Sequence, residues 1–177
     1  MRDDASSTGV VERFLALVLI VGGVVGALVS LRLVLYYLHS AGSSSGWVAA
    51  VPSAVILWLY IWCVIVGLRL WRRESRGWKW ATILFSMQIP IFTVPGLHYD
   101  YYAGIAVDVM RGHVARPFAL ALGANASIWL GPSITGFVYG MNLFACGAAV
   151  YLLLRRRMYG RFAKLAPGAP DASRLIG

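Results

Sequence analysis

The chain has 177 residues, of which 59% are hydrophobic and only 13% are charged, and its net charge is +9. Its mean hydropathy is +0.71. A soluble domain of this length has a small core and needs a polar surface, so it could not cover so much apolar area. The composition therefore excludes an ordinary soluble protein and predicts a protein that is embedded in the lipid bilayer.

Nearly all of the basic residues flank long apolar runs and do not form a patch of their own. This placement follows the positive-inside rule and requires no nucleic-acid partner. The two cysteines, Cys63 and Cys146, lie inside apolar runs, and the sequence has no Cys/His spacing typical of a metal site. We therefore expect no nucleic acid, no metal and no cofactor.

Four apolar runs are long enough to cross a bilayer, since a helix needs roughly 20 residues for one crossing. They predict an all-α integral membrane protein, a four-helix transmembrane bundle with spans at about 14–38, 47–71, 80–97 and 133–154. Basic residues gather before the first run, between the second and third, and after the fourth, which predicts both termini in the cytosol. The Ala-, Gly- and Arg-rich composition indicates a bacterium, so we expect a multi-pass protein of the plasma (inner) membrane.

Outside the transmembrane domain of residues 14–154, the sequence predicts short cytosolic ends. Residues 1–13 are polar and of mixed charge. Residues 155–177 begin with basic residues and become rich in Pro, Gly and Ala, so we expect a basic and largely disordered tail.

Small residues recur on two of the predicted helices. In the first predicted span, Gly22, Gly26 and Ser30 recur at every fourth position. In the fourth predicted span, Gly136 and Gly140 form a GxxxG motif, and the amide of Asn142 follows in mid-membrane. Small residues let two helices approach closely in lipid, and a buried amide can bond across such a contact. The pattern predicts helix packing within the bundle or between subunits.

The third span contains a polar side chain beside a helix breaker. Gln88 lies two residues before Pro90, which should kink the helix and free a backbone carbonyl. Lipid offers no partner for such groups. One interpretation is an interhelical hydrogen bond to Gln88, and the other is a broken helix that lines a small binding site or a pore.

Residues 98–132 form the one sizeable connection between predicted spans, on the extracytoplasmic side. Phe118, Leu120 and Leu122 alternate with small residues, which predicts a β-hairpin lying on the helices. An interfacial helix is the alternative, because Tyr101 and Ile105 also fit helical spacing.

This connection also contains the best candidate for chemistry. Its ionisable and phenolic side chains are His98, Asp100, Tyr101, Asp108, Arg111 and His113. Such a group could do acid–base work at the membrane edge, but a connection is also where polar residues of a membrane protein must lie. The sequence therefore predicts a possible polar site and no defined catalytic residues.

No acidic residue falls within the predicted spans, which disfavours ordinary ion-coupled transport. Phosphate-binding, serine-hydrolase and zinc-protease motifs are absent from the sequence. We therefore expect a non-enzymatic membrane subunit that assembles through its small-residue helix faces, as a homo-oligomer or as an accessory subunit of a larger complex, and uses the extracytoplasmic loop for recognition. The alternatives are an oligomeric pore lined by Gln88 and Asn142, and a membrane enzyme or ligand sensor that uses His98 and Asp100.

Overall fold

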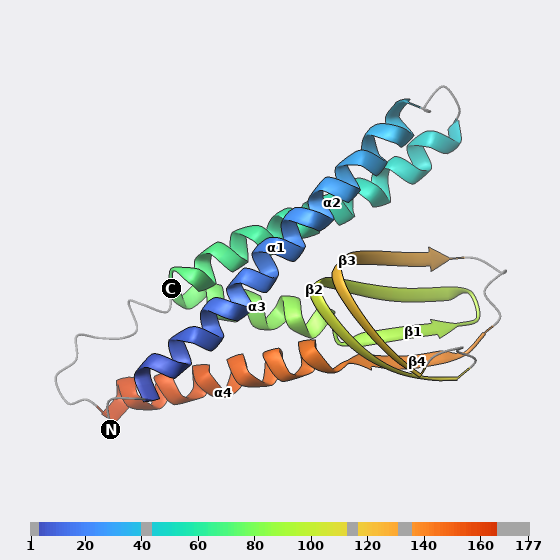
Figure 1. Cartoon of the computed structure of the whole chain (residues 1–177). Coiled ribbons are helices and arrows are strands. Elements are labelled where there is room, and N and C mark those ends of the chain that lie inside the picture. Colours follow the sequence, from blue (N-terminus) through green and yellow to red (C-terminus); the bar gives the residue numbers. More distant parts are fainter. Residues whose placement is uncertain (1–3, 40–43, 113–116, 131–135, 166–177) are drawn as a thin grey trace.

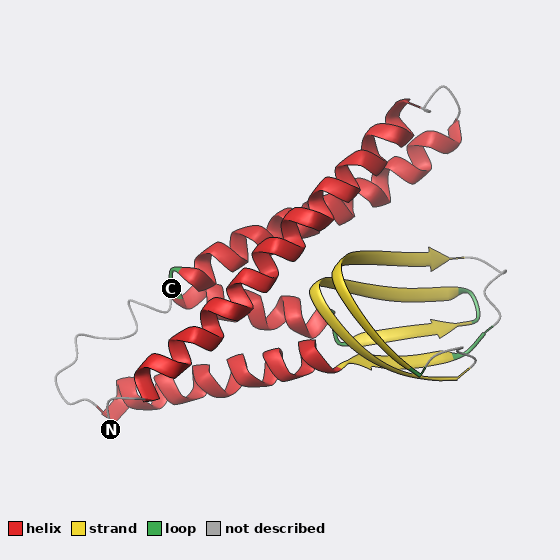
Figure 2. Ribbon diagram, viewed as in Figure 1, coloured by secondary structure: helices red, strands yellow, loops and turns green. Residues whose placement is uncertain are grey.

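The structure, a computed structural model, describes residues 4–39, 44–112, 117–130 and 136–165. These residues form helices and a four-stranded antiparallel sheet, and Figure 2 shows the two parts side by side. The elements are α1 (Asp4–His39), α2 (Ser44–Trp71), α3 (Ser75–Met87), β1 (Pro90–Val94), β2 (Leu97–Gly112), β3 (Phe118–Leu130), β4 (Val138–Asn142) and α4 (Leu143–Leu165). The prediction of an all-α, four-span bundle is therefore wrong.

Only α1 and α2 are long and apolar enough to cross a membrane as helices, among the residues that the structure describes. They pack against each other along much of their length (Figure 1). Their outward side chains are apolar, as at Leu28, which is 65% exposed, and Val55, which is 61% exposed. An apolar surface of this extent is stable in lipid and unfavourable in water.

The predicted third span, residues 80–97, is helical only as far as Met87. Gln88 is the C-terminal cap of α3, and β1 begins at Pro90. A proline disfavours helical geometry at the residue before it and has no N–H to donate. Pro90 therefore ends the helix, where the sequence predicted only a kink.

The predicted fourth span, residues 133–154, is also divided. Residues 138–142 form β4, and α4 begins only at Leu143. Gly136 lies before the strand and Gly140 lies within it, so the GxxxG motif is not on a helix. The apolar run was long enough for a helix, but its first part pairs with both β1 and β2.

Strand β2 is the longest strand and organises the sheet. Its first residues pair with β1, its last residues pair with β4, and β1 and β4 pair with each other. Each of the strands β1, β2 and β4 therefore pairs with the other two, which closes this part of the sheet on itself. Strand β3 pairs with β2 along thirteen residue pairs and has no second neighbour among the described strands.

The β2–β3 ribbon doubles back on itself, as Figure 1 shows. Gly104 and Gly123 lie directly opposite each other in the register, with φ of +99° and +129°. These angles are strained for residues that have a side chain. The paired glycines therefore allow both strands to bend at the same level.

The bend packs against the middle of α1. A Cβ atom added to Gly22 would lie only 2.6 Å from the Cα of Gly104. Next to this contact, Tyr101 reaches α2, where its ring centroid lies 5.7 Å from that of Tyr60. The core of the molecule thus joins α1, α2 and the bend of the sheet, and it continues between α3 and α4 through Ala81, Leu84, Ala145 and Leu152.

Candidate functional site

Because side chains alternate along a strand, the β2–β3 ribbon has an inner and an outer face. The inner face lies inside the doubled-back ribbon and bears His98, Asp100, Tyr102, Asp108, Asn125 and Ser127, together with Ala106, Ala119 and Ala121. The outer face bears Tyr101, Ala103, Ile105, Val107, Val109, Phe118, Leu120 and Leu122. The sheet is therefore polar inside and apolar outside.

His98 is held at both ring nitrogens on the inner face. Its Nδ1 lies 2.8 Å from the Thr93 hydroxyl of β1, and its Nε2 lies 3.1 Å from the Ser127 hydroxyl of β3. Each hydroxyl can donate or accept, so this arrangement fits either neutral tautomer of the ring. His98 thus links three strands by side-chain contacts.

Asp100 shares this face two residues further along β2. The Asn125 amide donates a 2.6 Å hydrogen bond to its Oδ2, whereas its Oδ1 is buried and has no hydrogen-bond partner among the described residues. No Lys or Arg side chain forms a described ion pair with this carboxylate. One carboxylate oxygen therefore has a hydrogen-bond donor, and the other has none among the described residues.

Asp108 and Asn142 lie opposite each other where β2 meets β4. Asp108 is 8% exposed and Asn142 is 1% exposed. The Asn142 Oδ1 accepts hydrogen bonds from the N–H groups of Val107 and Ala145, at 3.2 and 3.1 Å. Asn142 therefore caps α4 and fixes its start to the sheet. Asp108 lies close enough to Asp100 for the two carboxylates to interact electrostatically.

Gln88 connects the end of α3 to the sheet from the helical side. It is fully buried, and its Oε1 accepts a 3.1 Å hydrogen bond from the N–H of Ala103. This contact is a helix-to-strand bond, whereas the sequence predicted either a bond between helices or a lining position. The amide of Gln88, like that of Asn142, has an NH₂ group without a hydrogen-bond partner among the described residues.

The structure divides the predicted polar group. His98, Asp100 and Asp108 share the inner face, but Tyr101 points to the helices, where its hydroxyl lies 3.1 Å from the Cys63 sulfur. Arg111 is exposed near the end of β2. His113 lies outside the described residues. No three His, Cys, Asp or Glu side chains of the described residues form a group that could hold a metal.

Three partners in this network were not among the predicted site residues. They are Thr93, Asn125 and Ser127. The alternation of residues 118–127 could have placed Asn125 and Ser127 on one face. Their contacts to His98 and Asp100 depend on the pairing of β2 with β3, which the alternation does not specify.

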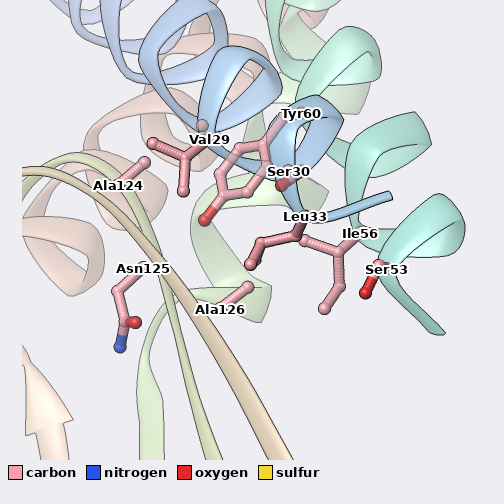
Figure 3. A pocket seen from close by; sticks show the side chains of 10 residues that line it. Val29, Ser30, Leu33, Ser53, Ile56, Tyr60, Ala124, Asn125 and Ala126 are labelled. Carbon is pink, nitrogen blue, oxygen red and sulfur yellow. The ribbon is translucent and has the colours of Figure 1, made fainter. Parts of the chain in front are cut away.

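A cavity of about 130 Å³ lies between α1, α2 and β3. Figure 3 shows that Val29, Leu33 and Ile56 face it from the helices, while the amide of Asn125 points away from them. The floor consists of Ala124 and Ala126, which are on the same face of β3 as Leu122. The cavity is therefore a mostly apolar hollow behind the polar inner face, and neither His98 nor Asp100 lines it.

The outer face carries the most exposed apolar side chains of the sheet. Phe118, Leu120 and Leu122 are 70%, 75% and 76% exposed, at alternate positions of β3. We call these three side chains the β3 row. The opposite, non-β2 edge of β3 has no strand beside it within the described chain. An apolar row next to a free backbone edge is a typical site for another strand to add.

The small residues of α1 are already in contact with the chain's own elements. Gly22 meets the bend of β2, and Gly26 lies against the ring of Tyr60 in α2. Ser30 is 4% exposed and lines the cavity behind β3. The Gly22–Gly26–Ser30 face is therefore occupied within one chain.

Comparison with known proteins adds no relative from which a function could be carried over. No family model, no curated protein and no solved structure matches the chain.

Proposed function

We propose that this chain is a non-enzymatic membrane subunit that assembles through the free edge of β3. The observation that carries the proposal is the combination of an unpaired strand edge with the exposed β3 row. The two long apolar helices would hold this edge at the membrane. As in the hypothesis from the sequence, the segment between the predicted third and fourth spans is the recognition surface. The contact between subunits, however, is now proposed at a strand and not at glycine-lined helices.

The composition of β3 supports this function. Its thirteen residues, FALALGANASIWL, include no charged residue and no proline. Soluble and monomeric proteins usually protect such an edge with lysine, proline, a bulge or a very short strand, because free N–H and C=O groups recruit other strands. An edge with none of the charge or proline protections is one that we expect to be paired in the working protein.

The partner that fits best is a second copy of this chain. Two β3 edges placed antiparallel would satisfy each other's backbone groups, and no like charges would meet, because β3 carries none. A two-fold contact of this kind uses the same surface on both chains. The glycine faces of α1 are covered by β2 and α2, so we do not place the contact there.

We do not extend the proposal to a pore or an enzyme. Gln88 and Asn142, which would line a pore, are buried where the helices join the sheet and bond to β2. His98 has a hydroxyl at each ring nitrogen. These bonds are sufficient to explain why the residues are polar, because buried polar groups need partners.

Native mass spectrometry from lipid nanodiscs tests the proposal. The wild-type chain should appear at multiples of 19.3 kDa, with twice the single-chain mass as the principal species. Leu120→Lys should convert it mainly to the single chain, because a charged side chain beside the edge opposes strand addition. Leu120→Val keeps the position apolar and introduces a β-branched side chain that suits a strand, so it should leave the assembly unchanged.

Two results would contradict the proposal. One is a wild-type protein that is a single chain at every concentration. The other is an assembly that is equally stable with leucine, valine or lysine at position 120. Co-purification of a different protein, released by Leu120→Lys, would keep the edge as the contact and replace the second copy as its partner.

A further inference from the structure

We infer that the sheet lies inside the bilayer, alongside the half of α1 and α2 distal to Arg13 and Arg155, with its outer face against lipid acyl chains. The third and fourth apolar runs then each cross the membrane half as helix and half as strand. The inference concerns the surroundings of the sheet, so it goes beyond the assembly proposed above.

The first observation is that the sheet is inside out relative to a water-soluble domain. Its most exposed apolar side chains are Phe118, Leu120 and Leu122, whereas the charged Asp108 is 8% exposed. Met141 and Tyr139 of β4, on the same outer face, are 48% and 56% exposed. In water this arrangement would expose apolar area at a cost, whereas in lipid the outward apolar face is favourable. The buried carboxylates are costly in either surrounding, so the exposed face decides between them.

The second observation is the depth of the bend. Arg13 and Arg32 are both exposed on α1 and lie nineteen positions apart, or about 28 Å along the helix. That distance matches a hydrocarbon core of roughly 30 Å, so the two guanidinium groups can reach opposite interfaces. Gly22, which contacts the bend at Gly104, lies nine positions after Arg13, about 14 Å along α1 and hence near the midplane.

The third observation is the length of the divided crossings. From Arg155 back to Leu143, α4 has twelve apolar or small residues, about 18 Å of helix. The five residues of β4 add about 16 Å. Helix and strand together are long enough for one crossing, and α3 with β1 repeats the arrangement. Neither α3 nor α4 appears among the helices that could cross alone.

The fourth observation is the placement of charge. Within the four described strands, the charged residues are Asp100 and Asp108 on the inner face and Arg111 near the end of β2. Phe118, at the same end of the ribbon, lies five residues from the bend at Gly123, or about 17 Å along the strand. If the bend is at the midplane, Arg111 lies at the distal interface, where an arginine is tolerated.

Lipid is the occupant that these observations favour for the β3 row. A strand added to the free edge would lie beside β3 in the plane of the sheet, so it would leave side chains perpendicular to the sheet uncovered. Immersion also requires that the edge be paired, because open sheet edges are not stable in hydrocarbon. Pairing of the β3 edge and immersion of the sheet in lipid are therefore compatible, and each is tested by a separate measurement.

Spin-label accessibility in phosphatidylcholine–phosphatidylglycerol nanodiscs tests the inference. Labels are attached to single cysteines at Phe118, Leu120 and Leu122 in a Cys146→Ser background, since Cys63 is fully buried. Leu28→Cys on α1 is the lipid-facing reference, and Arg111→Cys is the interfacial reference. Collisions with oxygen report lipid, and collisions with a nickel chelate report water.

The labels at Leu120 and Leu122 should match that at Leu28, with a ratio of oxygen to nickel collisions several-fold higher than at Arg111. The depth should decrease from Leu122 through Leu120 to Phe118. Nickel collisions as frequent as at Arg111 would place the sheet in water and overturn the inference. Immobilised labels that neither reagent reaches would show that protein covers the row, and would overturn it as well. Assembly measured by mass on the same samples separates this failure from a failure of the edge contact.

Discussion

Asp108 is the residue at which the inner face is least satisfied. It is 8% exposed, one of its carboxylate oxygens has no hydrogen-bond partner among the described residues, and the negative charge of Asp100 acts on it unfavourably. Removing a carboxylate from water without a cation or a full set of donors is unfavourable. We conclude that Asp108 lowers the stability of the fold, whatever role it has in the cell.

Asp108→Asn should therefore raise the free energy of unfolding at neutral pH by about 1–3 kcal/mol, because it removes the charge and keeps the shape. The measurement is denaturant unfolding of the protein in mild detergent. Asp100→Asn is the comparison: it relieves the same repulsion, but it also weakens a charge-assisted bond to Asn125, so it should stabilise less than Asp108→Asn. Destabilisation by Asp108→Asn would contradict this account, since it would mean that the carboxylate has a favourable partner.

At the scale of elements, the paired glycines at the ribbon bend determine how the sheet meets α1. Gly104 and Gly123 both have positive φ, but only Gly104 has a close neighbour: an added Cβ would lie 2.6 Å from the Val18 carbonyl oxygen. Around Gly123 no atom lies within 4 Å of such a Cβ. A substitution at Gly123 therefore tests backbone strain alone, whereas a substitution at Gly104 tests strain together with packing against α1.

Gly123→Ala should cost about 1–3 kcal/mol in the free energy of unfolding, from strain alone. Gly104→Ala should cost clearly more, because it adds a clash with α1 to the same strain. Gly147→Ala on α4, where a Cβ meets nothing within 4 Å, should instead stabilise by about 0.5–1 kcal/mol. Equal effects at Gly104 and Gly123 in denaturant unfolding would contradict the close packing of the bend against α1.

The same scale explains which elements could be predicted from the sequence. Two long apolar runs became α1 and α2, because length and uniform hydropathy are sufficient signals for such helices. Strands β1 and β4 were missed, because five-residue strands inside an apolar run cannot be distinguished from helix by periodicity. Pro90 held the missing information: it is compatible with the first residue of a strand and unfavourable inside a helix.

At the candidate site, the sequence identified His98, Asp100 and Asp108 by residue type. It did not separate them from Tyr101, although their odd and even positions on one strand place them on opposite faces. The contacts to Thr93, Asn125 and Ser127 join residues that are far apart in the chain and follow from strand pairing. Local patterns carry no direct information on such pairing.

For the whole molecule, one principle connects the apolar exterior, the polar interior and the divided crossings. Every backbone group must be paired where the surroundings are lipid, and a sheet can meet that condition only if no edge remains open. On one side, β1 and β4 pair with the two ends of β2, and between them the N–H groups of Ala103 and Val107 bond to the side chains of Gln88 and Asn142. On the other side, β3 leaves the condition unmet along its whole length. The central claim is therefore that the working protein has its β3 edge paired by another strand.

Residue-resolved amide hydrogen exchange of β3 in nanodiscs tests that claim most directly. Successive N–H groups along a strand point to opposite sides, so only alternate amides of β3 can bond to β2. Pairing of the free edge predicts strong, uniform protection at neighbouring residues of β3, and a loss of protection at every second amide in Leu120→Lys but not in Leu120→Val. A wild-type protein in which every second amide of β3 exchanges as fast as an unfolded chain would show an open edge in contact with water, and would contradict the account.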